Sequence, residues 1–363
     1  MFRLLGAKQK LRAWVDILTP KQANFFTPLI QRLSRHGTDI LATTREYREV
    51  NELLEIRKVS ALKIGRHGGG ALKKKLISSA ERTKQLALLL SKKECDFAIS
   101  FSSPEAARVA YGLSIPHCCV SDSPHAEAAS RLAIPLSKKL FTPKAVPKRA
   151  WSRYGIDEDR IVQYDALDPA AWLKGFKPDP KVLDELGLDH SLPIIAIRPE
   201  ETQASYLLEY GADALGSVAL VRTLRRKLPH SQVVLLPRYD SITSIKKLSS
   251  ESVIVTGRAV DATSLISYSR LFLGGGGTMT AESALLGVPT VSFYPAPATH
   301  VEKYLIRLGF IKRIRNVDGI VKHAVRVFDD ASYGEALKAR SRRLLSRMDD
   351  PIAVIEKHLA CFG

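Results

Sequence analysis

Short apolar runs alternate with longer amphipathic segments along most of the chain, and this alternation predicts a parallel α/β fold. The apolar runs of the first half predict strands at 13–18, 39–43, 59–64, 96–101, 115–120 and 139–142. The pattern restarts in the second half, with predicted strands at 193–197, 232–236, 252–256, 270–274 and 289–293. We therefore expect two Rossmann-like parallel-sheet domains facing a central cleft, with ligands outside the carboxyl ends of the strands.

A stretch without periodicity, YDALDPAAWLKGFKPDP at 164–180, separates the two halves. We expect an N-terminal domain at 1–165, a linker at 166–190 and a C-terminal domain at 191–363, with the last helix a candidate for packing back on the N-terminal domain. The length of 363 residues fits two domains of about 150 residues each.

The composition, 45% hydrophobic and 25% charged, is that of a globular protein. No apolar run approaches the roughly 20 residues that span a bilayer, and the basic N-terminus lacks the apolar segment of a secretory signal. The four cysteines form no CxxC pair, which indicates buried thiols. We expect a cytoplasmic protein, either free or peripheral at the inner face of the membrane.

The net charge of +18 is unevenly distributed. Residues 1–180 hold 31 Lys and Arg against 18 Asp and Glu, a net of +13, which leaves +5 for the rest. Such a field suits a phosphate-bearing acceptor, anionic lipid headgroups or nucleic acid. The run Lys73 to Lys75 opens a predicted helix, where it is either a solvated face or a docking site. Aromatic residues make up only 7% and are dispersed, which disfavours nucleic acid.

The stretch LFLGGGGTMTAESALLGVPTV, residues 271–291, places four glycines between a predicted strand and a predicted helix. A Walker loop would end in Gly-Lys-Ser or Gly-Lys-Thr, whereas Gly277 is followed by Thr278 and Met279. An NAD site would need an acidic residue about 20 positions on, where this chain has Phe293 and Tyr294. The pattern therefore favours neither of these nucleotide sites.

A glycine turn before a helix N-terminus is typical of a diphosphate site, because free backbone N–H groups and the helix dipole favour an anion. Gly275, Gly276 and Gly277 would leave room for the diphosphate. The hydroxyls of Thr278 and Thr280 would donate hydrogen bonds to it. The alternative is a tight turn that simply requires glycine.

Three further side chains are predicted to join this site. Glu282, one turn into the helix, would accept hydrogen bonds from two sugar hydroxyls, although it also suits the helix dipole without any ligand. Arg198 and Arg238 each follow a predicted strand and would reach the diphosphate from the carboxyl edge of the sheet. A lone arginine in such a position is more often a surface residue, but two at equivalent positions favour a function.

The segment GGGGTMTAESALLGVPTVSFYP resembles the nucleotide-binding signature of GT-B glycosyltransferases and of non-hydrolysing UDP-N-acetylglucosamine 2-epimerases. This resemblance implies that the glycine turn takes the diphosphate and that Glu282 takes the ribose. Almost the whole chain resembles a mainly archaeal domain-of-unknown-function family of predicted GT-B-type glycosyltransferases. The segments that carry this resemblance are WVDILTPKQANFFTPLI, TTREY, KIGRHGG, ISFSSPEAARVAYGLSIP, SDSPHAEAASRLAIPLS, LLPRYD and GGGGTMTAESALLGVP.

One departure from the family pattern concerns the acceptor base. The loop after the first strand usually carries histidine where this chain has Gln22 and Asn24. Asp16, at the end of the first strand, remains as a carboxylate that could deprotonate the acceptor. The alternative, a structural Asp that binds turn amides, is equally consistent with the sequence.

A second polar group follows the strand at 115–120. Asp122, His125 and Glu127 lie in SDSPHAEAASR, which is similar to the H-x-E-A-x-x-R segment of the 2-epimerases, where the Glu serves acid-base chemistry. Asp122 is alternatively a helix cap, and His125 an ordinary residue of the first turn.

Three further residues are candidates for the acceptor side. Ser102 and Ser103 precede a predicted helix, where they either cap it or meet an acceptor phosphate. His67 lies in the loop GRHGGG, which either closes over a substrate or is a flexible turn.

The sequence thus predicts a glycosyltransferase that uses a nucleotide diphosphate sugar, with a UDP-sugar as the expected donor, and an anionic acceptor that is lipid-linked in one version of the hypothesis. Positive groups and helix dipoles would stabilise the leaving diphosphate, so we expect no metal ion and no cofactor. The alternatives are a sugar-nucleotide 2-epimerase and a non-catalytic basic module that binds RNA or an acidic glycan.

Overall fold

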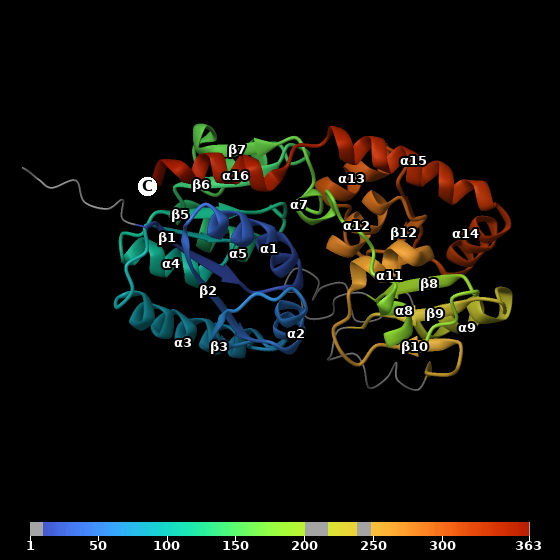
Figure 1. Cartoon of the computed structure of the whole chain (residues 1–363). Coiled ribbons are helices and arrows are strands. Elements are labelled where there is room, and N and C mark those ends of the chain that lie inside the picture. The colour runs from blue at the N-terminus through green and yellow to red at the C-terminus, as the bar shows by residue number, and fades with distance from the viewer. Residues whose placement is uncertain (1–9, 200–216, 238–247, 363) are drawn as a thin grey trace, which may run out of the picture. The chain divides into compact units, whose positions relative to one another are not determined.

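The chain forms two compact α/β units. The computed structural model describes residues 10–199, 217–237 and 248–362. Residues Met1–Asp165 together with Asp350–Gly363 make up the N-terminal unit, and Ala166–Asp349 make up the C-terminal unit. Each unit contains one parallel sheet, as the alternation of apolar and amphipathic segments predicts (Figure 1).

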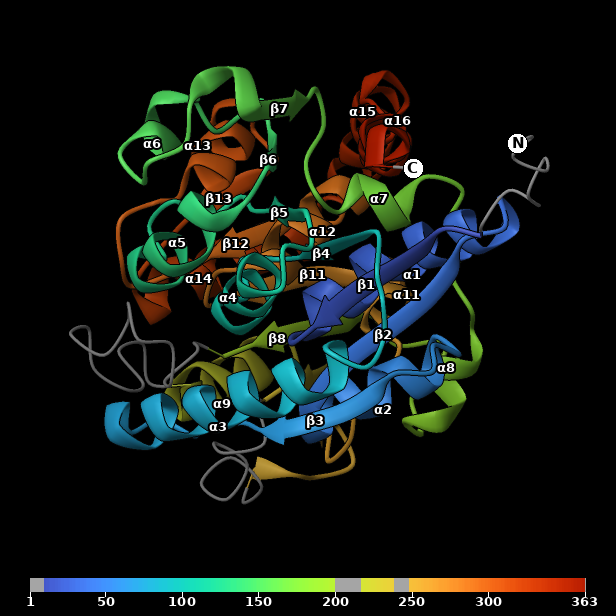
Figure 2. The same cartoon turned by 90° about the vertical axis from the view of Figure 1, so that its left-hand side faces the viewer.

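The N-terminal unit contains a seven-stranded sheet in the order β3-β2-β1-β4-β5-β6-β7. Its strands are β1 (Arg12–Ile17), β2 (Asp39–Glu46), β3 (Leu62–Arg66), β4 (Phe97–Ser100), β5 (His117–Val120), β6 (Lys139–Pro143) and β7 (Ile161–Tyr164). Two groups of helices cover the faces of this sheet, and within each group neighbouring helices pack side by side (Figure 2). The first group is α1 (Pro20–Arg35), α2 (Arg48–Ile56) and α16 (Pro351–Leu359), and the second is α3 (Leu72–Leu90), α4 (Pro104–Gly112) and α5 (Glu127–Ala133), while the short α6 (Arg149–Ser152) precedes β7.

In the C-terminal unit, the described residues form a six-stranded sheet in the order β10-β9-β8-β11-β12-β13. Its strands are β8 (Ile194–Arg198), β9 (Gln232–Leu235), β10 (Val253–Val255), β11 (Ser269–Gly274), β12 (Thr290–Ser292) and β13 (Ile311–Arg313). Its helices are α7 (Ala170–Leu173), α8 (Lys181–Glu185), α9 (Ser217–Lys227), α11 (Ala262–Tyr268), α12 (Thr278–Leu286), α13 (His300–Arg307), α14 (Val317–Asp329) and α15 (Ala331–Arg347).

The stretch expected to be a linker, 166–190, carries α7 and α8. Val182 and Leu183 of α8 are buried in a core cluster with Ile194 of β8 and Leu265 of α11. These apolar contacts explain why the stretch folds with the C-terminal unit although its sequence has no clear periodicity.

The order of strands reverses direction beside the first strand of each sheet. In the N-terminal unit this happens between β1 and β4, and in the C-terminal unit between β8 and β11. The connections leaving two such strands run to opposite faces of the sheet, and this topology is typical of a ligand crevice outside their carboxyl ends. These two positions are therefore the candidate ligand sites of the protein.

No helix among the described residues is long and apolar enough to cross a membrane.

A fully buried histidine links the middle strands of the N-terminal sheet to the segment before β6. His117 Nε2 lies 2.9 Å from Ser100 Oγ, and its Nδ1 lies 2.8 Å from Ser137 Oγ. Burial lowers the pKa of His117 to about 4, because desolvation disfavours the charged imidazolium. The folded protein therefore holds this ring neutral.

This burial predicts a pH dependence of stability. Above the ordinary pKa of 6.5, the contribution of neutral His117 to the free energy of unfolding is fully present. This contribution is lost as the pH falls toward about 4, because in that range only the unfolded chain binds the proton. Between pH 7 and pH 5 the free energy of unfolding of the N-terminal unit should fall by about 2 kcal/mol. Urea titrations should show this fall in the wild type and a clearly smaller one in His117→Gln, and equal falls would contradict the assignment.

Candidate functional site

The crevice of the C-terminal unit lies between the ends of β8 and β11. Gly274, the last residue of β11, pairs in register with Arg198, the last residue of β8. The amide of Gly275 donates a 2.8 Å hydrogen bond to the Arg198 carbonyl, and the Arg198 guanidinium donates a 2.8 Å bond to the Leu236 carbonyl. The structure thus brings Arg198 beside the glycine turn, whereas Arg238 lies outside the described residues.

Two of the four glycines are required by packing within the protein. A Cβ on Gly276, whose φ is +100°, would lie 2.3 Å from Cδ2 of Tyr294. A Cβ on Gly274 would lie 2.3 Å from Oγ1 of Thr280. Close packing against Tyr294 therefore accounts for glycine at 276 without a phosphate, and the predicted role of Gly276 in making room for a ligand stays a prediction.

Gly277 differs from these two glycines because it faces open space. It is exposed, has a φ of +81°, and a Cβ there would meet no atom within 4 Å. Gly277 is also the N-cap of α12, and it has no side chain to accept a hydrogen bond from the first turn. The backbone N–H groups at the start of α12 are therefore not capped by the side chain of the N-cap residue, and Thr278 beside them is partly exposed.

A buried hydroxyl at the same place lacks a partner. Thr280, which is 3% exposed, has no hydrogen bond to its Oγ1 among the described residues. This oxygen faces Gly274, at the point where β11 enters the turn. Buried polar atoms in folded proteins are nearly always hydrogen-bonded, so an unsatisfied one beside a helix N-terminus favours a group that binds there.

Glu282 is held by two side chains that the sequence did not single out. It is 2% exposed, and its Oε1 accepts hydrogen bonds from Trp172 Nε1 at 2.9 Å and from Thr263 Oγ1 at 2.5 Å. These donors come from α7 and α11, so two other helices fix the orientation of the carboxylate. An indole N–H in the supposed linker, which needs an acceptor, was the only sequence signal for this contact.

The loop after β12 is tied down by a second carboxylate. Glu302 Oε1 accepts a 2.5 Å bond from Ser292 Oγ, and its Oε2 pairs with Arg313 Nη1 at 3.1 Å. Arg313 Nη2 donates a 2.9 Å bond to the Tyr294 carbonyl. This network fixes Tyr294, whose ring packs against Gly276. The charged side chains of Glu302 and Arg313 therefore stabilise the glycine turn indirectly.

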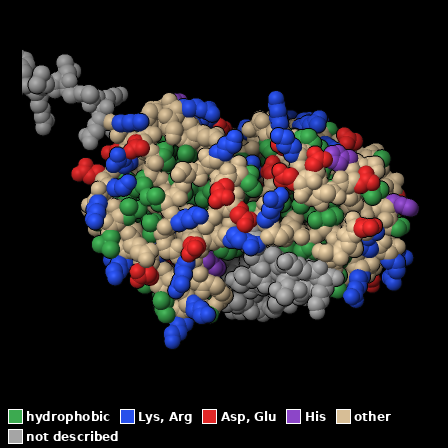
Figure 3. Space-filling view, turned by 60° about the horizontal axis from the view of Figure 1, so that its bottom comes forward, with side chains coloured by type: hydrophobic (Ala, Val, Ile, Leu, Met, Phe, Trp, Pro, Cys, Tyr) green, Lys and Arg blue, Asp and Glu red, His purple; other side chains and the backbone are tan. Residues whose placement is uncertain are grey.

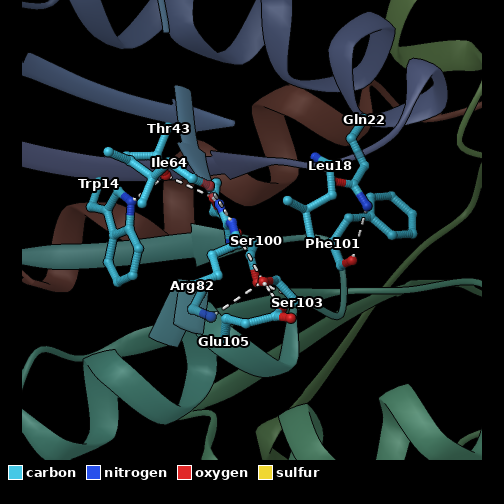
Figure 4. Close-up of polar contacts among 12 residues, drawn as sticks. Trp14, Leu18, Gln22, Thr43, Ile64, Arg82, Ser100, Phe101, Ser103 and Glu105 are labelled. Carbon is cyan, nitrogen blue, oxygen red and sulfur yellow. Dashed lines mark hydrogen bonds and ion pairs between the residues drawn. The ribbon is translucent and has the colours of Figure 1, made fainter. Parts of the chain in front are cut away.

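The crevice of the N-terminal unit is occupied by a buried ion pair (Figure 4). Asp16, which is fully buried, receives Arg82 Nη2 on Oδ1 at 2.6 Å and Arg82 Nη1 on Oδ2 at 3.1 Å. Thr43 Oγ1 donates to Oδ1 at 2.7 Å and Ser103 Oγ to Oδ2 at 2.8 Å. Four hydrogen bonds from β2, α3 and the start of α4 therefore converge on one carboxylate of β1.

These contacts explain Asp16 without a role as acceptor base. Burial by itself raises the pKa of this carboxyl, but Arg82, Thr43 and Ser103 outweigh it and hold the pKa below its usual range. A carboxylate that is enclosed and strongly bonded is a weak proton acceptor, because protonation would break the pair with Arg82. The base role of Asp16 stays a prediction, and the geometry favours a structural role.

Gln22, where the family pattern usually has histidine, bridges the two loops of this crevice. Its Oε1 accepts a 2.6 Å bond from the Leu18 amide, and its Nε2 donates a 3.1 Å bond to the Phe101 carbonyl. Asn24 accepts a 2.9 Å bond from Arg57 Nε. Both side chains thus have structural partners in place of a proton-transfer role.

The two serines after β4 shape the entry to α4. Ser103 is the N-cap of this helix, and its Oγ accepts a 3.2 Å bond from the Ala106 amide. Ser102 has a φ of +50°, which is uncommon for a residue other than glycine. Ordinary capping accounts for Ser103, and a contact of either serine with an acceptor stays a prediction.

A second arginine of this cluster, Arg45, is next to last in β2. Its enclosed Nε has no hydrogen-bond partner among the described residues, and its guanidinium carbon lies 6.0 Å from the centre of the Tyr47 ring. Desolvation lowers the pKa of Arg45, and the charge of Glu105 opposes this effect. Glu105 is itself buried, with Ser103 Oγ at 3.4 Å. Arg45 was part of the motif TTREY, but the sequence pattern gave it no role.

Two carboxylates of the group after β5 pair with different basic residues. Asp122 pairs with Lys21 Nζ at 2.6 Å, at the start of α1. His125 is exposed, and Glu127 is exposed and paired with Arg131 at 2.7 Å. The hydrogen bond and charge of Arg131 lower the pKa of Glu127, which is the opposite of what a general acid needs. An acid-base role for these three residues stays a prediction.

His67 is stacked within the N-terminal unit. Its ring lies 4.7 Å from the ring of Tyr47, and its Nδ1 accepts a 3.1 Å bond from the Gly69 amide. Its loop therefore has internal contacts, and closure over a substrate stays a prediction. In the described ranges, no three His, Cys, Asp or Glu side chains come together as metal ligands would.

The contrast between Arg82 and Arg45 gives a prediction. Arg82→Met leaves the buried Asp16 carboxylate without its cation and should lower the free energy of unfolding by about 3–5 kcal/mol. Arg45→Met removes no hydrogen bond and should change it by less than about 1 kcal/mol, in either direction. Urea titrations of both variants, monitored on the N-terminal unit, would contradict this assignment if the two losses were equal.

Comparisons with known proteins agree with the expected family and fold. The chain matches the family described as "Protein of unknown function (DUF354)" over residues 11–360. It is 32% identical over 318 residues to the uncharacterized protein MJ0665 of Methanocaldococcus jannaschii, which covers 86% of this chain and 90% of that protein.

Solved structures with a similar fold include two kinds of enzyme. The UDP-GlcNAc 2-epimerase from Neisseria meningitidis, bound to UDP-GlcNAc, superposes with a TM-score of 0.74 at 16% identity, over 96% of this chain and 100% of that one. The glycosyltransferase SnogD from Streptomyces nogalater superposes with a TM-score of 0.64 at 17% identity, over 98% and 100%. These likenesses confirm the expected GT-B-like fold, and the chain belongs to the DUF354 family.

Proposed function

We propose that this protein is a glycosyltransferase that binds a nucleotide diphosphate sugar at the carboxyl edge of its C-terminal sheet. The observation that carries the proposal is the start of α12. There an uncapped helix N-terminus opens at Gly277, and the buried hydroxyl of Thr280 has no partner among the described residues. A diphosphate supplies the acceptor oxygens and the negative charge that such a site favours.

Each neighbouring side chain has a part in this proposal. The amides at Gly277 and Thr278 and the hydroxyl of Thr280 donate to the diphosphate. Arg198, held at the end of β8, balances its charge. Glu282 accepts the ribose hydroxyls, and Trp172 and Thr263 keep its carboxylate in one orientation.

Two features of the proposed reaction have separate support, namely a UDP-sugar as the donor and transfer without a metal ion. Similar structures are described as bound to UDP-GlcNAc or in complex with UDP, which supports a UDP-sugar as the donor. The helix dipole and Arg198 supply positive charge where the leaving diphosphate develops negative charge, which supports a metal-independent transfer.

The acceptor would bind the basic N-terminal unit. Residues 1–180 carry a net charge of +13, which supports an anionic acceptor. Arg45 is the candidate to meet it, because it lies near the carboxyl end of β2 and its Nε has no hydrogen-bond partner among the described residues. Among the candidate bases, Asp122 is partly exposed, whereas Asp16 is enclosed.

A 2-epimerase acting on the sugar nucleotide itself is the second candidate. An epimerase turns over without an acceptor, whereas a transferase needs one. Incubation of the full chain with UDP-GlcNAc alone, followed by separation of the sugar products, distinguishes them. The exposed pair of Glu127 with Arg131 favours transfer, because an epimerase needs this glutamate for proton transfer at the sugar.

Thr280 offers the sharpest mutational test of the site. Thr280→Val keeps the volume and removes a hydroxyl that has no bond in the free protein, so stability should stay the same or rise. The affinity for a UDP-sugar should fall by about tenfold, because one hydrogen bond to phosphate is lost. Calorimetric titration measures the affinity, and thermal unfolding measures the stability.

Thr290→Val is the matched control. Thr290 is also buried in the C-terminal unit, but its Oγ1 lies 2.8 Å from Ser283 Oγ and donates to the Val288 carbonyl at 2.7 Å. This variant should lose stability and keep the affinity of the wild type. Loss of stability in Thr280→Val with unchanged affinity would remove Thr280 from the site.

A further inference from the structure

The first half of α3 exposes apolar side chains that the N-terminal unit does not cover. Leu72, Leu76 and Ile77 are 65%, 72% and 58% exposed. No residue from 71 to 81 is buried, and the buried side chains of this helix begin at Arg82. Large apolar side chains exposed together on one element indicate an interaction surface.

Helical geometry gathers these residues on one side. At about 100° per residue, Leu72, Leu76 and Ile77 fall within an arc of roughly 140°, and Lys73 lies inside that arc. Leu88, which is also exposed, points in nearly the same direction as Ile77, about three turns further along the helix. Of the buried side chains in the second half of the helix, Arg82 and Leu86 fall outside this arc, and Leu90, near the end of the helix, falls in line with Leu72.

The loop before α3 holds the start of the helix in place. A Cβ on Gly68 would lie 2.6 Å from Cα of Lys75 and 2.8 Å from the Lys74 carbonyl oxygen, so only glycine lets the loop pack this closely. The stack of His67 on Tyr47 attaches the same loop to the end of β2. The surface is therefore ordered before it meets a partner, and docking costs little conformational entropy.

The lysines decide what kind of partner fits. Lys73, Lys74 and Lys75 lie in the same two turns as the exposed leucines, and Figure 3, in which the lower side of Figure 1 comes forward, shows Lys and Arg side chains among hydrophobic ones there. Nucleic acid would use the lysines but leave the leucines in water. An anionic bilayer uses both, because leucine side chains enter the acyl boundary while lysine ammonium groups stay among the lipid phosphates.

We propose that the first two turns of α3, with Leu72, Leu76 and Ile77 as apolar anchors and Lys73 and Lys74 as cationic contacts, dock this protein on an anionic lipid surface. The inference does not depend on the sugar-nucleotide site. If both hold, the enzyme works at a membrane surface, where it can meet a lipid-linked acceptor.

Vesicle co-sedimentation of the full chain tests the proposal. The probes are vesicles of phosphatidylcholine alone and of phosphatidylcholine mixed with phosphatidylglycerol. The wild type should bind the anionic vesicles and bind the neutral ones much more weakly. The triple variant Leu72→Ser/Leu76→Ser/Ile77→Ser should lose at least about tenfold in affinity, and Lys73→Ala/Lys74→Ala about fivefold per lysine.

Leu132→Ser is the matched control, because Leu132 is 58% exposed on α5 of the same unit and lies outside this surface. It should bind vesicles like the wild type. All variants should unfold at the wild-type temperature, since the substituted side chains are exposed, and the Thr280→Val variant should bind vesicles normally. This last result keeps a failure of the docking proposal distinct from a failure of the nucleotide site.

Three outcomes would overturn the proposal. In the first, the wild type does not bind anionic vesicles. In the second, the lysine variant loses binding but the leucine variant does not, which is simple electrostatic adsorption of the kind that nucleic acid would also show. In the third, the leucine variant binds vesicles normally but loses self-association in sedimentation velocity, which would assign the surface to contacts between copies of the chain.

Discussion

The reversal of strand order beside the first strand of each parallel sheet is the constraint on which the rest of this structure depends. Because neighbouring connections leave to opposite faces there, the chain must leave a crevice at the carboxyl ends of β1 and β4 and of β8 and β11. The register of strand pairing determines which residues lie side by side at these crevices. The register of β8 with β11 puts Arg198 beside Gly274, and that of β1 with β4 puts Asp16 beside Ser100.

The two crevices have opposite chemistry although their topology is the same. In the N-terminal unit, Arg82 reaches across from α3 and satisfies Asp16, while Gln22 joins the two loops. In the C-terminal unit, the corresponding place holds a glycine turn, an uncapped helix and the unpartnered hydroxyl of Thr280 among the described residues. Burial of charge in the first crevice demands partners within the protein, whereas the second keeps donors available to a ligand.

The sequence was sufficient for the fold because apolar periodicity is a local signal. Every strand predicted from an apolar run overlaps an observed one. β7 (Ile161–Tyr164, IVQY) and β13 (Ile311–Arg313, IKR) were not predicted, because polar residues interrupt their short sequences and leave no apolar run. The resemblance to a family of GT-B-type enzymes added the arrangement of two such domains, and the comparisons confirm both the family and the fold.

The sites were less predictable, because their contacts join residues far apart in the chain. Arg82 lies 66 positions from Asp16, and Trp172 lies 110 positions from Glu282, so no spacing rule connects them. The ring of Tyr294 leaves no room for a side chain at position 276. The sequence of the glycine turn itself does not reveal this contact. Sequence patterns located the edges of the sheets, but side-chain partners across the fold decided which carboxylate is enclosed and which hydroxyl is left without a partner.

Hydrogen exchange of the backbone amides at Gly276, Gly277 and Thr278, measured with and without a UDP-sugar, tests the central claim most directly. If the start of α12 binds the diphosphate, these amides become hydrogen-bonded to it, and their exchange should slow on addition of the ligand while most of the N-terminal unit is unaffected. Binding of the sugar nucleotide with no change in exchange at these three amides would contradict the account.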